Sequence, residues 1–168
     1  MSFIGVIAKS KNAQYISKFL QENLDKKVCK VIVINNNSIE NMKNVKFETI
    51  LITENNEEII QNRELLKNII KNTRNIVINT DVDNSLELIE NIKLSVITYG
   101  FNSKATITAS SVANDDILIC LQRKMNNIYG EEIEPQEINV NLEAIKITNN
   151  SHIIMGIVAV FLLYNKNI

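Results

Sequence analysis

Apolar residues along the chain follow two alternating patterns. Short runs rich in β-branched residues predict strands at residues 3–7, 28–34, 47–53, 75–80 and 94–100. Between these runs, apolar residues recur at helical spacing from about Asn12 to Leu24 and over residues 55–72, and a shorter helix is expected at residues 85–91. Strands that alternate with helices in this way indicate right-handed β-α-β crossovers. We therefore predict an α/β fold with a mostly parallel sheet flanked by helices.

The pattern changes after Gly100. Residues 105–112 and 116–124 are predicted to be neighbouring strands joined by residues 113–115, and residues 137–147 alternate as a strand does. An apolar helix is expected from about Ser151. We thus expect a small antiparallel β patch in the C-terminal half, and a single domain over residues 1–168.

Composition limits the partners to be expected. The 168 residues are 45% hydrophobic with a net charge of -1, which gives no reason to expect nucleic acid binding. The most apolar segment, residues 153–164, is about half the roughly 20 residues needed to span a bilayer, so we expect a buried helix and no membrane insertion. Without a secretory signal, we expect a cytoplasmic protein in which Cys29 and Cys120 are buried free thiols. Enrichment in Ile and Asn is typical of an AT-rich, low-GC genome, so single asparagines carry little functional weight.

The first predicted strand and helix are joined by a polar turn within FIGVIAKSKNAQYISKFLQENL (residues 3–24). Strand, tight turn and helix is the arrangement in which nucleotide-binding proteins hold a phosphate, yet this turn has no glycine after Gly5. Free N–H groups at a helix start attract anions, and two lysines add positive charge. The turn is therefore predicted to be a weak anion site formed by Lys9, Ser10, Lys11 and Asn12.

A longer segment, NIVINTDVDNSLELIENIKLSVITYGFNSKATITASSV (residues 75–112), resembles a known family. It is similar to the central, ATP-binding domain of the Mur ligases, the amide-forming enzymes that attach amino acids to peptidoglycan precursors. Asn79, Asp81 and Asp83 stand in the family's Asn-Ala-Asp-Asp-Pro-like turn, and residues 97–101 match its ITYGF segment. The resemblance implies a shortened, stand-alone domain with a P-loop-type topology.

The same resemblance extends to NSHIIMGIVAVFLLY (residues 150–164), which is similar to the family's G-x-H-N-x-x-N-x-x-A-A helix. His152 falls on the histidine of that motif and Ala159 on one of its alanines. Ile153 and Gly156 stand where the family has asparagines.

On this alignment the family's phosphate loop, Gly-Thr-Asn-Gly-Lys-Thr-Thr, falls on the polar turn. Ala8 and Lys11 replace its glycines, Asn12 replaces the catalytic lysine, and Ala13 and Gln14 replace its threonines. The glycines let backbone N–H groups approach the phosphates, the lysine reaches the terminal phosphates and the hydroxyl binds Mg²⁺. All three are missing, so we expect a degenerate domain that is not an enzyme, with no cofactor, no catalytic residue and no metal ligand.

Other parts of the family's machinery also differ. Residues 35–46 fill the interval in which the family carries a metal-binding glutamate, and TENNEEII (residues 53–60) replaces its Ser-Pro-Asp-His turn. Glu54, Glu57 and Glu58 are interpreted either as stray Mg²⁺ ligands or, more commonly for such residues, as carboxylates that compensate a helix dipole. We also expect the family's precursor-binding and amino-acid-binding domains to be absent.

Three further candidates have both a functional and a structural interpretation. His152, the only histidine, is either a general base or ligand or, more commonly, a residue at a helix start. Asp81 and Asp83 either form a carboxylate pair or, more commonly, serve as turn and cap residues. Tyr99 and Phe101 lie in the region near the family's nucleotide, but aromatics beside a glycine turn more often pack than stack on a base.

These observations lead to three hypotheses. The first is a Mur ligase-like pseudoenzyme that works by binding, as a scaffold or regulator in the cell-envelope or sporulation biology of a low-GC bacterium; the resemblance alone implies this setting. The second is a sensor that binds a nucleotide or another anionic small molecule at Lys9, Ser10 and Lys11. The third is assembly with a protein partner or a second copy, for which the helix at residues 153–163 is one candidate face, although burial of this helix within the domain is the simpler interpretation.

Overall fold

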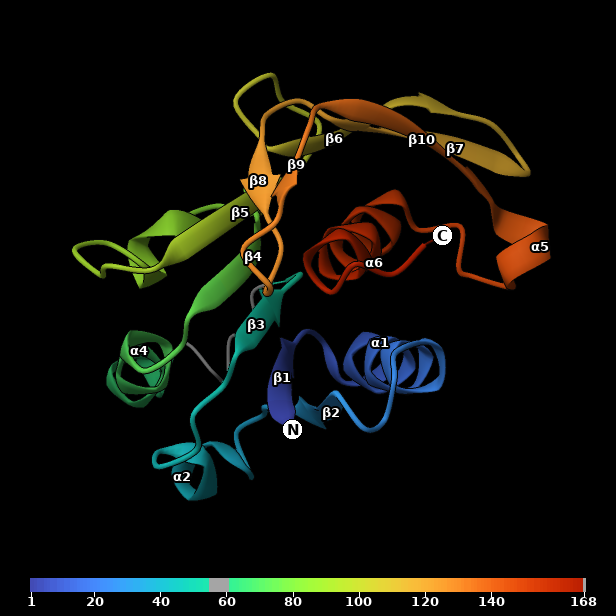
Figure 1. Cartoon of the computed structure of the whole chain (residues 1–168). Helices are drawn as coiled ribbons and strands as arrows, with labels where there is room; N and C mark the ends of the chain where they lie inside the picture. Colours follow the sequence, from blue (N-terminus) through green and yellow to red (C-terminus); the bar gives the residue numbers. More distant parts are fainter. Residues whose placement is uncertain (55–60, 168) are drawn as a thin grey trace.

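The computed structural model describes residues 1–54 and 61–167, and it is built on an eight-stranded sheet with the order β10-β7-β6-β5-β4-β3-β1-β2 (Figure 1). The parallel strands are β1 (Ser2–Ile7), β2 (Cys29–Val33), β3 (Thr49–Ile52), β4 (Asn75–Asn79), β5 (Ser95–Tyr99) and β6 (Ile107–Val112). The antiparallel strands β7 (Asp116–Leu121) and β10 (Gln136–Asn141) extend the sheet, and β8 (Met125–Asn126) and β9 (Glu132–Ile133) form a separate pair. The predicted α/β fold, mostly parallel with a small antiparallel patch, is confirmed.

Helices cover both faces of the parallel strands and divide the apolar interior into two clusters. On one face lie α1 (Ser10–Asn23) and α6 (Ser151–Leu163). On the other lie α2 (Ile39–Met42), α4 (Arg63–Lys71) and the 3-10 helix η1 (Ser85–Leu88). The three layers follow from strands whose side chains alternate between two faces that must both be shielded from water.

Helix α6 is the most buried helix of the described residues, with ten of its 13 residues buried. The strands β6, β7 and β10 curve over it, and α1 lies on its opposite side (Figure 1). Apolar neighbours on every side explain why this helix is apolar all round rather than on one stripe. No helix within residues 1–54 and 61–167 is long and apolar enough to cross a membrane.

Three local predictions differ from the structure. Residues 85–91 form only the 3-10 helix η1, and the short α2 was not predicted. The strand expected at residues 137–147 ends at Asn141, where the chain turns into α5 (Leu142–Ile145). The Asn141 side-chain oxygen accepts a hydrogen bond from the Ala144 N–H at 2.7 Å, so a polar residue that fits the strand alternation acts as a helix cap.

Two further predictions concern the helix before β4 and the cysteines. The helix predicted at residues 55–72 is present as α4 from Arg63 to Lys71, and residues 55–60 lie outside the described part of the chain. Cys29 is buried, as predicted, but Cys120 is partly exposed. Burial alternates along β7, and Cys120 falls on the face of that strand that lies away from α6.

Candidate functional site

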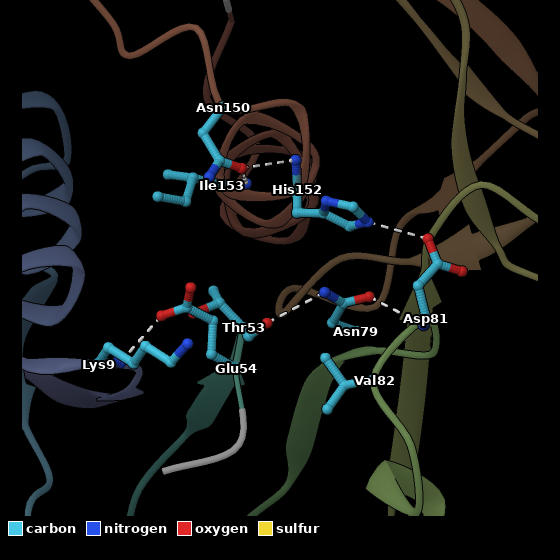
Figure 2. Close-up of a pocket in the computed structure, with 9 residues that line it drawn as sticks. All are labelled: Lys9, Thr53, Glu54, Asn79, Asp81, Val82, Asn150, His152 and Ile153. Atoms are coloured by element: carbon cyan, nitrogen blue, oxygen red, sulfur yellow. Dashed lines mark hydrogen bonds and ion pairs between the residues drawn. The ribbon is translucent and has the colours of Figure 1, made fainter.

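A cavity of about 380 Å³ opens where the carboxyl ends of β1, β3 and β4 meet the first turns of α1 and α6. Figure 2 shows the residues that line it: Lys9, Thr53, Glu54, Asn79, Asp81, Val82, Asn150, His152 and Ile153. Ligands of open α/β sheets bind at the carboxyl ends of parallel strands, because loops and helix starts converge there. Topology thus brings together side chains that are far apart in the sequence.

The start of α1 is already in contact with a carboxylate of the chain itself. Glu54, immediately after β3, accepts a hydrogen bond from the Lys9 backbone N–H at 3.0 Å. Both of its carboxylate oxygens also lie 3.1 Å from Nδ2 of Asn12, which donates to them. Lys9 is the N-cap residue of α1 and makes no side-chain cap, so Glu54 supplies the negative charge that a helix start favours.

Of the four residues predicted to form an anion site, only Lys9 lines the described cavity. Lys9 lines the cavity, whereas Asn12 is half-buried and engaged with Glu54. Ser10 and Lys11 are exposed in the first turn of α1 and are not among the lining residues of the described cavity. Glu54 compensates the dipole at the start of α1, to which its hydrogen bonds run; Glu57, Glu58 and the start of the helix predicted at residues 55–72 lie outside the described residues.

A second polar cluster joins α6 to the loop after β4. Nε2 of His152 lies 3.0 Å from Oδ2 of Asp81. A carboxylate only accepts, so Nε2 carries the proton. The Phe101 ring meets the imidazole edge-on, with ring centroids 5.1 Å apart. Asn79 holds the loop in place, since its side chain accepts from the Asp81 N–H at 3.0 Å and donates to the Thr53 carbonyl at 3.0 Å.

Asp81 is also held by the turn that follows β5. Its carboxylate accepts from the Phe101 N–H at 2.6 Å and from Nδ2 of Asn102 at 3.1 Å. Gly100 permits this approach, because a Cβ at that position would lie 2.5 Å from Oδ1 of Asp81. Burial raises the pKa of Asp81, but hydrogen bonds from Phe101, His152 and Asn102 outweigh it, so the pKa is lowered from its ordinary 3.8.

Tyr99 is the last residue of β5 and is fully buried. Its hydroxyl donates to the Ile52 carbonyl at 3.4 Å. Burial, followed by the negative charges of Glu54 and Asp81, raises its pKa well above the ordinary value. The interpretation of Tyr99 as a packing residue is therefore confirmed, while Phe101 is 49% exposed and its ring contacts the imidazole of His152.

The charges around the cavity give it a mixed character. Two carboxylates, Glu54 and Asp81, face one ammonium group, Lys9, and the imidazole of His152. Within the described residues, no three His, Cys, Asp or Glu side chains come together in an arrangement that would hold a metal ion. Neutral or zwitterionic polar molecules suit this lining better than a triphosphate, which carries several negative charges.

Two of these contacts were not predicted from the sequence. The pair between Asp81 and His152 joins residues 71 positions apart, and the contact of Glu54 with Asn12 joins residues 42 positions apart. The contact between Asp81 and His152 could have been predicted from the sequence, because Asp81 directly follows a predicted strand and His152 lies at the start of a predicted helix. Both belong at the carboxyl edge of a parallel sheet.

Comparison with protein-family models gave no match, and comparison with curated proteins gave none either. Among solved structures, MurF from Acinetobacter baumannii superimposes on 99% of this chain with a TM-score of 0.62 and 11% sequence identity. The chain has a Mur ligase-like fold. It spans 44% of the MurF chain. A CheY-like protein, TadZ from Pseudomonas aeruginosa PAO1, covers 62% of this chain at 10% identity with a TM-score of 0.38.

Proposed function

We propose that this protein is a non-catalytic Mur ligase-like domain that acts by binding, as a scaffold or regulator. The observation that supports this most directly is the position of Glu54. Its carboxylate takes hydrogen bonds from Lys9 and Asn12 at the start of α1, where a phosphate-binding loop would hold its phosphates. A nucleotide would have to displace this carboxylate and then tolerate its charge nearby.

The residues of the turn support the same proposal. Asn12, at the position of the family's catalytic lysine, is uncharged and already donates to Glu54. Ala13, at the position of a metal-binding threonine, is buried and has no hydroxyl. A role in the cell envelope or in sporulation, with another protein or a second copy as partner, follows from the family resemblance and is proposed on that ground.

Calorimetric titration with ATP and Mg²⁺ tests the proposal. We expect no saturable heat up to about 1 mM nucleotide, and no phosphate release on prolonged incubation. A thermal unfolding curve on the same sample provides the control that the protein is folded. Binding in the micromolar range, or turnover above that of a heat-denatured sample, would show that the proposal is wrong.

A second candidate function is a sensor for a small anionic ligand such as a sugar phosphate or a nucleotide. It is favoured by one observation: Lys9 and His152, the two groups able to carry positive charge, line the same cavity. A panel of phosphorylated compounds should then raise the melting temperature, and Lys9→Ala should abolish the rise. Lys11→Ala is the matched control, because Lys11 is exposed on α1 and lies outside the cavity. If no compound shifts the wild-type protein, the sensor function is ruled out.

A further inference from the structure

The outer edge of β10 offers unpaired backbone groups. β10 is the last strand of the sheet and pairs only with β7 on its inner side. The Leu142 N–H donates to the Asp115 carbonyl at 2.8 Å. This bond shows which residues of β10 are hydrogen-bonded to β7, because hydrogen-bonded and non-hydrogen-bonded pairs alternate along an antiparallel ladder. By the alternation of that ladder, the N–H and C=O groups of Glu137 and Asn139 point away from β7. Within the described residues, no hydrogen bond reaches these four groups.

A groove lined by both apolar and polar side chains runs beside this edge. The cavity there has a volume of about 440 Å³ and lies between β10 and the segment that follows α6. Ile133, Ile138 and Leu162 line it, and all three are half-buried side chains packed against the main core cluster. A strand added next to β10 would place every second side chain on the same side of the sheet as Ile138. Those side chains would enter the groove and extend the core.

The charged residues next to the β10 edge indicate which kind of polypeptide segment could bind there. Residues 130–137, GEEIEPQE, contain four glutamates and no basic residue. Lys124 pairs with Glu132 and Glu134 at 2.9 and 2.8 Å, and Lys166 lies on the rim of the groove. Four carboxylates and two ammonium groups leave a net charge of −2. A second copy of β10 carries Glu137 and no basic residue, so it offers this edge no complementary charge and is a poor occupant.

The opposite edge of the sheet is protected in a way that β10 is not. At the β2 edge, the Val31 N–H donates to Oε1 of Gln21 at 2.9 Å, so a side chain of α1 covers the strand. Natural proteins commonly shield sheet edges in this manner. The contrast marks β10 as the edge that is open to another chain.

We infer that β10 binds an extended basic segment of a partner protein by strand addition, with alternate apolar side chains of that segment in the groove lined by Ile133, Ile138 and Leu162. Main-chain hydrogen bonds to Glu137 and Asn139 supply affinity, and the groove and the glutamates supply selectivity. The inference rests on the proposed binding role and identifies the kind of partner.

A labelled heptapeptide of alternating lysine and valine is a suitable probe for fluorescence anisotropy. We expect saturable binding to the full chain, and at least a roughly tenfold loss of affinity for Asn139→Pro, which removes one outward N–H and leaves the ladder to β7 intact. Asn139→Ala is the matched control, since it changes the same side chain but keeps the N–H, and it should bind as the wild type does. Glu137→Lys should also weaken binding.

Two peptide controls make the result independent of variant folding. A peptide of alternating glutamate and valine should not bind, and a lysine-valine peptide methylated on alternate amides should lose at least roughly tenfold in affinity. Equal binding of the methylated or the acidic peptide, no saturation up to about 1 mM, unchanged binding to a folded Asn139→Pro, or a dimer that this variant dissolves would each overturn the inference. Such a failure leaves the ATP titration result, and so the proposed non-catalytic function, unaffected.

Discussion

Replacement of Asp81 by Asn is the most informative single perturbation of the cavity. The carboxylate takes hydrogen bonds from the Phe101 N–H, from Asn102 and from His152. Asparagine has one acceptor oxygen and one donor amide group. Its oxygen can replace one of the two carboxylate oxygens, but its NH₂ group would then face another hydrogen-bond donor in place of the second oxygen. Hydrogen bonds to charged groups contribute about 1.5–3 kcal/mol each. The Asp81 side chain is 26% exposed and His152 is 38% exposed, so the lower end of that range applies.

We therefore expect Asp81→Asn to lower the free energy of unfolding by about 2 kcal/mol at neutral pH. For a chain of this size that corresponds to a fall of about 4–8 °C in the melting temperature. The folded-state pKa of Asp81 lies below its ordinary 3.8, so the unfolded chain takes up the proton more readily. The stabilisation is thus complete well above pH 3.8 and is lost as the pH falls through the folded-state pKa.

Thermal unfolding of the wild type and Asp81→Asn from pH 7 down to about pH 3 tests both statements, because the difference should shrink in acid. Asp115→Asn, in the exposed turn between β6 and β7, is the matched control and should leave stability unchanged at every pH. Equal melting temperatures of the Asp81 variant and the wild type at pH 7 would refute the reasoning. So would a difference that is undiminished at pH 3.

Substitutions at three other positions have expected outcomes that chemical denaturation can measure. Gly156→Val should destabilise the protein by roughly 1–3 kcal/mol, because even a Cβ at Gly156 would lie 3.0 Å from the Tyr99 hydroxyl oxygen; an unchanged midpoint would contradict this packing. Asn150→Ala should cost about 1 kcal/mol, since Oδ1 of Asn150 caps α6 by accepting two backbone N–H bonds, and Asn150→Ser should recover most of it. Tyr164→Phe should cost about 1 kcal/mol by removing the buried bond of 3.2 Å to Thr49; the role of this bond is disproved if the variant is as stable as the wild type.

The alternation of strands and helices was predictable because each element is encoded by its own apolar periodicity. Residues 75–80 and 94–100 illustrate this, since both correspond to strands in the structure, β4 almost fully buried and β5 buried at Ile97 and Tyr99. The short elements were not predictable for the opposite reason. α5 depends on one side-chain cap at Asn141, in a segment whose alternation continues the strand. Elements of four residues have too little periodicity to compete with such local contacts.

The candidate site was harder to predict than the fold because its contacts depend on which strand ends lie side by side. The prediction of an anion site used Lys9 to Asn12 alone, and the local sequence holds no sign that Glu54 reaches the same helix start. The position of Glu54 follows from the pairing of β1 with β3, which places residue 54 next to residue 9. Single-chain periodicity does not specify strand order.

The burial of α6 has a consequence for the order in which the protein folds during synthesis. Its side chains contact strands from both the parallel and the antiparallel parts of the sheet, so the larger apolar cluster is incomplete until residues 151–163 have been made. Until then the inner faces of β4, β5 and β6 are exposed to water, and exposed apolar surface of this kind favours aggregation of the nascent chain. Mutations that slow the docking of this late segment should reduce the yield of soluble protein in cells more than they reduce the stability of molecules that have finished folding.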